Sequence, residues 1–206
     1  MIQGSGLYTT AEGEQQYMEP GDLLTQPTWT WHGTTNTGQE PAVWFTAMDT
    51  SLMQFLDAWF VEKFPDGRSQ PITKPDGYHM RRVGALRPTQ GIDGFGPFPV
   101  KYPWQDTLTA LNDLAKAGEK DPHDGVVLDY VDPRDGGPTT STLHCRVQMI
   151  FPGEETRSHR HTSSAVYFVI KGLGETRLAK KKTEENVLSG ASGTFLAFRD
   201  GIGIAL

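Results

Sequence analysis

The 206-residue chain has a single cysteine, Cys145, and no hydrophobic run approaching the roughly 20 residues that a membrane-spanning helix needs. One cysteine excludes an intramolecular disulfide and a zinc site built from several thiolates. Basic residues are few: 19 Lys and Arg stand against 25 Asp and Glu, a net charge of −6, which argues against a nucleic-acid-binding face. No signal peptide is recognisable at Met1. These absences predict a cytoplasmic protein that binds neither membranes nor nucleic acid.

Glycine and proline are abundant instead, with 23 and 14 residues, and they predict many turns between short strands. The strand-like stretches are 7–10, 17–18, 23–25, 42–45, 126–128, 143–151 and 165–170. Apolar spacing predicts one helix from Thr50 or Ser51 to Lys63, with a buried stripe, and another over 104–117, closed by Gly118. We expect three segments, 1–64, 65–124 and 125–206.

A short repeat organises the chain. Ile2-Gln3-Gly4-Ser5-Gly6 returns 168 residues later as Ile170-Lys171-Gly172-Leu173-Gly174. The first copy is followed by a Pro-Gly-Asp turn and His32, whereas the second is preceded by Gly153 and a pair of histidines. The two halves therefore look like complementary pieces of one repeated unit. The first piece lacks the front of the unit and the second lacks its back.

Histidines in both pieces are candidate metal ligands. His159 and His161 are two residues apart, which on a strand directs both rings to the same face, and imidazole suits Fe, Zn, Ni or Cu. The plainer alternative is two surface histidines on a polar loop. His32 lies among aromatic residues, where a single histidine is also compatible with a core or surface role. The spacing around these residues decides between the alternatives.

These spacings resemble the two signature motifs of cupins. The first motif runs over Gly153–Gly172 and includes the histidine pair, with Ala165 or Val166 where cupins have Glu. The second runs over Gly21–Asn36, with Trp29 in place of a Gly. The resemblance implies a mainly β fold, the double-stranded β-helix or jelly roll, in the form of a bicupin fragment with short connecting helices.

The segment Pro27-Thr28-Trp29-Thr30-Trp31-His32 narrows the resemblance to gentisate 1,2-dioxygenases and their salicylate and 1-hydroxy-2-naphthoate relatives. The similarity extends to about Thr183, so an internal fragment of a longer bicupin is expected. It implies an Fe(II) enzyme of aromatic degradation that uses O2 to open the ring of a hydroxylated aromatic acid, and a homo-oligomer when full length. His32 matches the third iron ligand of the first cupin, whereas His159 and His161 match a second-cupin pair that often carries no catalytic iron.

The first-cupin His-x-His that would complete the iron site does not precede His32 in this chain. Three readings follow: a ring-cleaving dioxygenase, an inactive remnant of one, or a metal-independent sugar-binding or storage cupin. With one imidazole, Fe(II) is not expected to bind tightly. The repeat offset puts the missing pair at positions −9 and −7 of this numbering, about eight to ten residues upstream of Met1. Catalytic and substrate-binding residues are not assignable, and an open half-barrel is expected to aggregate or exchange strands.

The tail carries a separate prediction. After about Glu185 the resemblance fades, and Gly201-Ile202-Gly203-Ile204 has no counterpart, although the offset puts a second Trp-x-Trp-His near position 200. One possible set of codons for Asp200-Gly201-Ile202-Gly203-Ile204 would also encode Trp-Asp-Trp-His in another frame. We therefore predict a frameshift after about Thr183. The alternative is a divergent in-frame tail.

Overall fold

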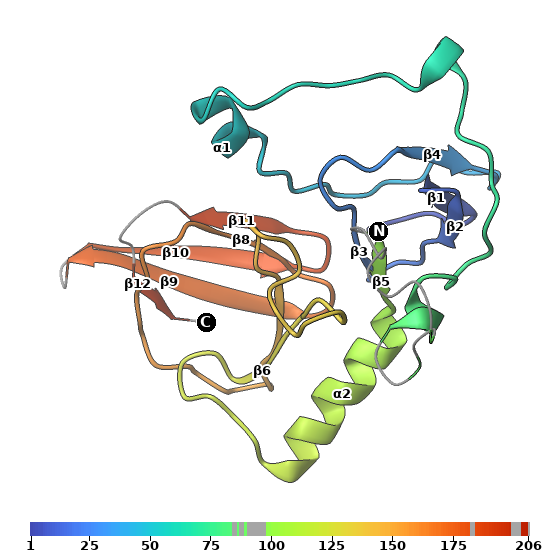
Figure 1. The fold of residues 1–206 in the computed structure, drawn as a ribbon. Coiled ribbons are helices and arrows are strands. Elements are labelled where there is room, and N and C mark those ends of the chain that lie inside the picture. Colours follow the sequence, from blue (N-terminus) through green and yellow to red (C-terminus); the bar gives the residue numbers. More distant parts are fainter. Residues whose placement is uncertain (84–85, 87–88, 90–97, 182–183, 199–202, 206) are drawn as a thin grey trace. The chain divides into compact units, whose positions relative to one another are not determined.

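The computed structural model describes residues 1–83, 86, 89, 98–181, 184–198 and 203–205 (Figure 1). Its described part is mainly β, which confirms the predicted class. The strands are β1 (Leu7–Ala11), β2 (Glu14–Tyr17), β3 (Leu23–Thr25), β4 (His32–Asn36), β5 (Val100–Tyr102), β6 (Val126–Asp129), β7 (Arg146–Met149), β8 (Ala165–Phe168), β9 (Leu173–Lys181), β10 (Glu184–Ala191), β11 (Phe195–Phe198) and β12 (Gly203–Ala205). The helices are α1 (Thr50–Phe55) and α2 (Trp104–Ala117), with 3-10 turns η1 (Pro65–Gly67) and η2 (Met80–Arg82).

The chain divides into two compact units. Unit 1 comprises Met1–Thr107 and Asp129–Cys145. It contains the antiparallel sheet β2-β1-β4 and the strand pair β3-β5. Among the described residues of this unit, buried apolar side chains lie on or beside β1, β2 and β5, and they include Leu7, Ala11, Met18, Phe98 and Val100. The three predicted segments divide the chain differently and stay a prediction.

Unit 2 comprises Leu108–Leu128 and Arg146–Leu206. Its sheet has the order β10-β9-β12, and the pairs β11-β8 and β6-β7 accompany it. Leu178 on β9 is buried, and Tyr167, Leu188 and Leu196 pack against it from three other strands. β9 and β10 form the long antiparallel hairpin of this unit (Figure 1).

The two units repeat one another, as the sequence predicted. Sheet β2-β1-β4 has the same strand order as β10-β9-β12. Met1 makes two backbone hydrogen bonds with the turn before β3. Its ammonium group donates to Asp22 O, and its carbonyl oxygen accepts from Gly21 N–H. Val169 makes the same two bonds with Thr194 and Gly193, the turn before β11.

The spacing of the two copies grows within the hairpin. Met1 and Val169 differ by 168 residues, but Gly21 and Gly193 differ by 172, so the second copy has four additional residues between Val169 and Gly193. The register then places Gly203 opposite Ala179, where the first copy has His32 opposite Ala11. The strand equivalent of His32 is therefore at 203 rather than near 200. Residues 199–202, which hold part of the predicted frameshifted segment, lie outside the described residues, and the frame of the tail stays a prediction.

Two expected elements differ in unit 1. The strand expected at 42–45 is reduced to a single bridge between Gln3 and Val43. The helix expected to reach Lys63 ends at Phe55, and Asp57 then has a positive φ of 52°. No residue of α1 is buried, and Phe55 is 83% exposed. The apolar stripe of this helix does not predict burial here, because in unit 1 the sheet does not cover α1. The helix lies on a long connection that leads away from β4 (Figure 1).

The second helix matches its prediction. α2 spans the expected residues, with Leu111 buried on its inner face. Gly118 has a φ of 75°, and its N–H donates to the carbonyl of Ala115, so it closes the helix as a left-handed residue. The apolar spacing and the capping glycine therefore predict the same helix.

Candidate functional site

The segment Pro27–His32 connects β3 to β4 and presents His32 at the start of an edge strand. His32 pairs with Ala11 in the sheet and is exposed. Its Nδ1 lies 3.0 Å from the carbonyl of Thr30. Because a carbonyl only accepts, Nδ1 carries the proton and Nε2 keeps its lone pair. A histidine prepared in this way is suited to metal ligation through Nε2.

Trp29 occupies the position where the cupin motif has Gly. Its φ is 60°, a left-handed conformation that glycine adopts without steric cost and a bulky residue rarely adopts. The Trp29 ring is 64% exposed and rests against Phe60, with ring centres 4.7 Å apart. The structure therefore explains the motif: the backbone needs the left-handed turn even where the glycine has been replaced.

Trp31 is fixed by polar contacts on both sides of its peptide. Its N–H donates to a carboxylate oxygen of Glu12 at 2.8 Å, and its carbonyl accepts from Glu12 N–H at 3.0 Å. The same carbonyl accepts from the Gln70 amide at 2.8 Å. These bonds hold the residue before His32 against the β1–β2 hairpin, so the imidazole starts from a well-defined backbone.

A buried acid–base pair lies on the same hairpin, and sequence reasoning missed it. Glu14 is fully buried on β2, and His79 bonds to its carboxylate through both the ring Nδ1 and the backbone N–H. The His79 ring stacks on Phe98. Burial of the Glu14 carboxyl raises its pKa, but the hydrogen bonds from His79 outweigh this and hold the pKa below its ordinary value. The pair joins residues 65 positions apart, and no local pattern indicates it.

The predicted pair His159 and His161 lies in unit 2. The two ring centres are 5.8 Å apart, which confirms that both rings are on one side of the chain. A third ring, His123, is 5.5 Å from His159. His123 was not predicted, although it stands in the turn-like run Asp121-Pro122-His123-Asp124-Gly125, where a polar ring is easily presented.

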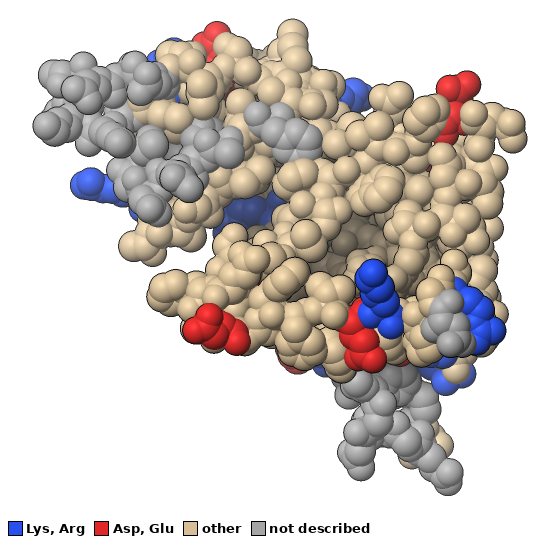
Figure 2. All heavy atoms as spheres, turned by 90° about the horizontal axis from the view of Figure 1, so that it is seen from above, with Lys and Arg blue, Asp and Glu red and all other residues tan. Residues whose placement is uncertain are grey.

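Two negative findings apply to the described ranges. No three His, Cys, Asp or Glu side chains, in the positions the structure gives them, surround a point that could hold a metal ion. None of the helices there is both long and apolar enough to cross a bilayer. On the face seen in Figure 2, acidic and basic side chains are scattered and form no continuous basic patch.

Comparison with known proteins assigns the class first. A family model described as "Cupin domain" matches residues 1–48, which contain sheet β2-β1-β4 and the Pro27–His32 segment. A variant of salicylate 1,2-dioxygenase from Pseudoaminobacter salicylatoxidans, solved in complex with gentisate, superposes with a TM-score of 0.82 at 26% identity, covering 99% of this chain and 57% of that one. The chain is thus a cupin.

The curated relatives assign the family. The chain is 41% identical to 5-aminosalicylate 1,2-dioxygenase of Comamonas sp, over 84% of this chain and 46% of the relative. It is 37% identical to gentisate 1,2-dioxygenase of Haloferax sp, over 86% of this chain and 53% of the relative. The chain belongs to the gentisate 1,2-dioxygenase family of cupins. It spans about half the length of the curated relatives it matches.

Proposed function

We propose that this chain carries part of the machinery of an Fe(II)- and O2-dependent dioxygenase that opens the ring of a hydroxylated aromatic acid, with His32 as one of its iron ligands. The single observation behind the proposal is the Pro27–His32 segment. It presents an exposed imidazole whose Nδ1 is satisfied by Thr30 O and whose Nε2 is free to bind a metal. Relatives named for dioxygenases of gentisate and 5-aminosalicylate support the same chemistry.

The residues present do not complete an iron site. No group of three ligating side chains includes His32 in the described part of the chain, and one imidazole does not hold Fe(II) against water. The 206 residues alone are therefore expected to lack turnover, as an inactive remnant would. The proposed activity requires two further histidines, from a His-x-His that comes before β1 in the sequence.

A chimera tests this. The parts of the Comamonas 5-aminosalicylate 1,2-dioxygenase that lie outside its match to this chain are joined to residues 1–198 at the corresponding ends. Oxygen uptake is measured with added Fe(II) and gentisate, salicylate, 5-aminosalicylate or 1-hydroxy-2-naphthoate. A dioxygenase puts both atoms of O2 into its product, so no reductant is needed. The control is the same chimera with His32→Ala.

Oxygen uptake by the chimera that the His32→Ala control lacks would support the proposal, together with no uptake by the 206-residue chain. A folded, iron-loaded chimera that consumes no O2 with any of the four acids would refute the function. Uptake by the chain alone would refute the statement that its iron site is incomplete. The acid that is consumed identifies the substrate class.

A further inference from the structure

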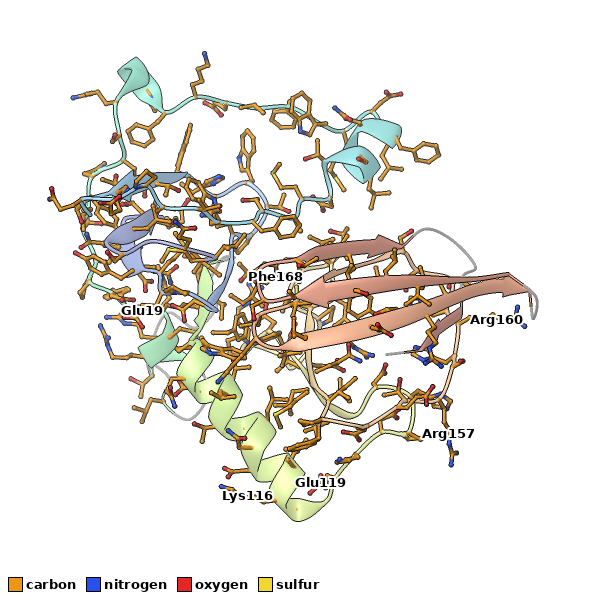
Figure 3. All side chains as sticks on the ribbon, turned by 180° about the vertical axis from the view of Figure 1, so that it is seen from behind. Glu19, Lys116, Glu119, Arg157, Arg160 and Phe168 are labelled. Carbon is orange, nitrogen blue, oxygen red and sulfur yellow. The ribbon has the colours of Figure 1, made fainter. Side chains whose placement is uncertain are left out.

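Unit 1 carries an exposed apolar arm, residues 43–61, on the connection that leads from β4 through α1 toward η1 (Figure 1). Most of its large apolar side chains are exposed, with exposed fractions from 42% at Leu52 to 83% at Phe55. Figure 3 shows side chains projecting from α1 on more than one side. Single exposed apolar residues are ordinary on a protein surface, but a run of them marks an interaction surface.

The apolar arm is attached to the rest of unit 1 at both of its ends. At the start, Val43 N–H donates to Gln3 O at 2.9 Å, and Gln3 N–H donates to Val43 O at 3.0 Å. Near the end, the Phe60 ring lies against Trp29, with ring centres 4.7 Å apart. A surface that the fold already holds in place loses less conformational entropy when a partner covers it.

The exposed area is as large as a stable interface requires. Six exposed aromatic side chains contribute to it, and they are Trp29, Trp44, Phe45, Phe55, Trp59 and Phe60. An aromatic side chain presents about 150–250 Å², so at their exposed fractions the six leave roughly 500–900 Å² uncovered. The largest patch of a typical monomer is about 300–600 Å², whereas a standard interface takes about 800 Å² from each partner. The arm therefore has the area of one side of such an interface.

The charges of the apolar arm restrict the chemistry of its partner. Asp49 and Asp57 are its charged residues, and its sequence contains no Lys or Arg. The Asp49 carboxylate already accepts a hydrogen bond from the Thr142 hydroxyl. Helices that lie on membranes carry Lys and Arg on their polar face, and nucleic-acid-binding surfaces are basic, so neither occupant fits. The partner must instead present an apolar surface with few charges.

The apolar arm of a second copy has this chemistry. We propose that the arms of two copies of this chain pack against one another in a two-fold dimer, to which each copy contributes the same residues. Phe55, the most exposed ring of the arm, and Trp59 lie inside the contact. Asp57 of each copy stays at the rim, because two like charges repel and a buried carboxylate needs a partner. The dimer requires neither His32 nor iron, so it is independent of the proposed oxygenase function.

Analytical ultracentrifugation of the full 206-residue chain over a range of concentrations tests the dimer. The disruptive variants are Phe55→Ser and Trp59→Ser, and Phe55→Leu is the conservative variant that keeps an apolar side chain. Leu173→Ser is the matched control, since Leu173 is 88% exposed but lies on β9 in unit 2. A second control, Thr35→Lys, places a charge on β4, an edge strand of its sheet, and so blocks pairing through that edge. Circular dichroism of each variant shows whether the fold is kept.

The wild-type chain should be a dimer at about 10 μM, because interfaces of this area dissociate in the micromolar range or below. Phe55→Ser and Trp59→Ser should each raise the dissociation constant at least about 10-fold with unchanged circular dichroism, because buried aromatic anchors dominate such contacts. Phe55→Leu and both controls should dimerise like the wild type.

A wild-type chain that stays monomeric at about 100 μM, well above that range, would overturn the proposal. Folded Phe55→Ser and Trp59→Ser variants that dimerise as tightly as the wild type would also overturn it. Loss of the dimer in Thr35→Lys would assign the contact to the edge of β4, and loss in Leu173→Ser would assign it to unit 2. Either result would refute the role of the apolar arm.

Discussion

The buried pair of Glu14 and His79 makes a sharp prediction about stability. The Glu14 side chain has no exposure and that of His79 has 9%, so solvent screens their interaction little. His79→Ala would leave a buried carboxylate without its principal partner, and breaking a buried pair in this way typically costs about 3–5 kcal/mol. Glu14→Gln should cost less, about 1 kcal/mol, because a neutral amide oxygen still accepts from the His79 ring.

Urea unfolding followed by fluorescence measures the effect. With a slope of about 1–3 kcal/mol per M, a loss of 4 kcal/mol lowers the midpoint by roughly 1–4 M. The control is Lys116→Ala, which removes an exposed pair with Asp113 and should change stability by less than about 1 kcal/mol. Equal shifts for His79→Ala and Lys116→Ala would refute the view that burial makes the first pair important.

The pH dependence follows from the sign of the Glu14 shift. Its pKa is held below the ordinary value, since the hydrogen bonds from His79 outweigh the burial that would raise it. The stabilisation is therefore complete above the unfolded carboxyl pKa near 4.3, and it is lost as the pH falls through the lower folded value. Glu14→Gln should remove this acid-dependent component. An unchanged acid limb in that variant would count against the assignment.

Three further predictions concern a repeated turn, a buried phenol and the exposed helix. Gly21→Ala should destabilise more than Gly193→Ala in thermal unfolding. Both have positive φ, worth about 1–2 kcal/mol, but only at Gly21 would the new Cβ meet a neighbour, 2.6 Å from the Trp104 ring. Burial raises the pKa of Tyr102 to about 12, so its stabilisation is complete below the unfolded value near 10 and lost above it; Tyr102→Phe should remove the last phenolate step in an absorbance titration. Phe55→Ser should reduce light scattering on concentration, because its ring is 83% exposed.

The parts of the fold that were predictable are those specified by local signals. α2 was predicted residue for residue because apolar spacing and the left-handed Gly118 indicate the same helix. The repeat was predictable because two glycine-rich copies start equivalent hairpins. The 42–45 strand and the long first helix were wrong because apolar content alone does not show what covers a segment, and Trp44 and Phe55 are exposed.

The candidate sites divide in the same way. His159 and His161 share a face because of their spacing of two, which sequence reasoning used. His123 is 36 positions before His159 and Glu14 is 65 before His79, so only the folded chain brings each to its partner. Backbone carbonyls that set the proton positions of His32, His123 and His161 also have no sequence signature.

The two copies of the repeated topology carry their histidines at different points of the cupin motif. In each copy, the turn before β3 or β11 is hydrogen-bonded to the residue that precedes the repeat, Met1 or Val169. Both copies therefore hold this turn in the same way. Unit 1 contributes a single imidazole from the back of its motif, and in the described residues no group of three ligating side chains includes it. Unit 2 contributes a pair from the front of its motif and a third ring from the loop tied to that pair by Arg157. Iron at His32 therefore requires ligands from outside the described residues.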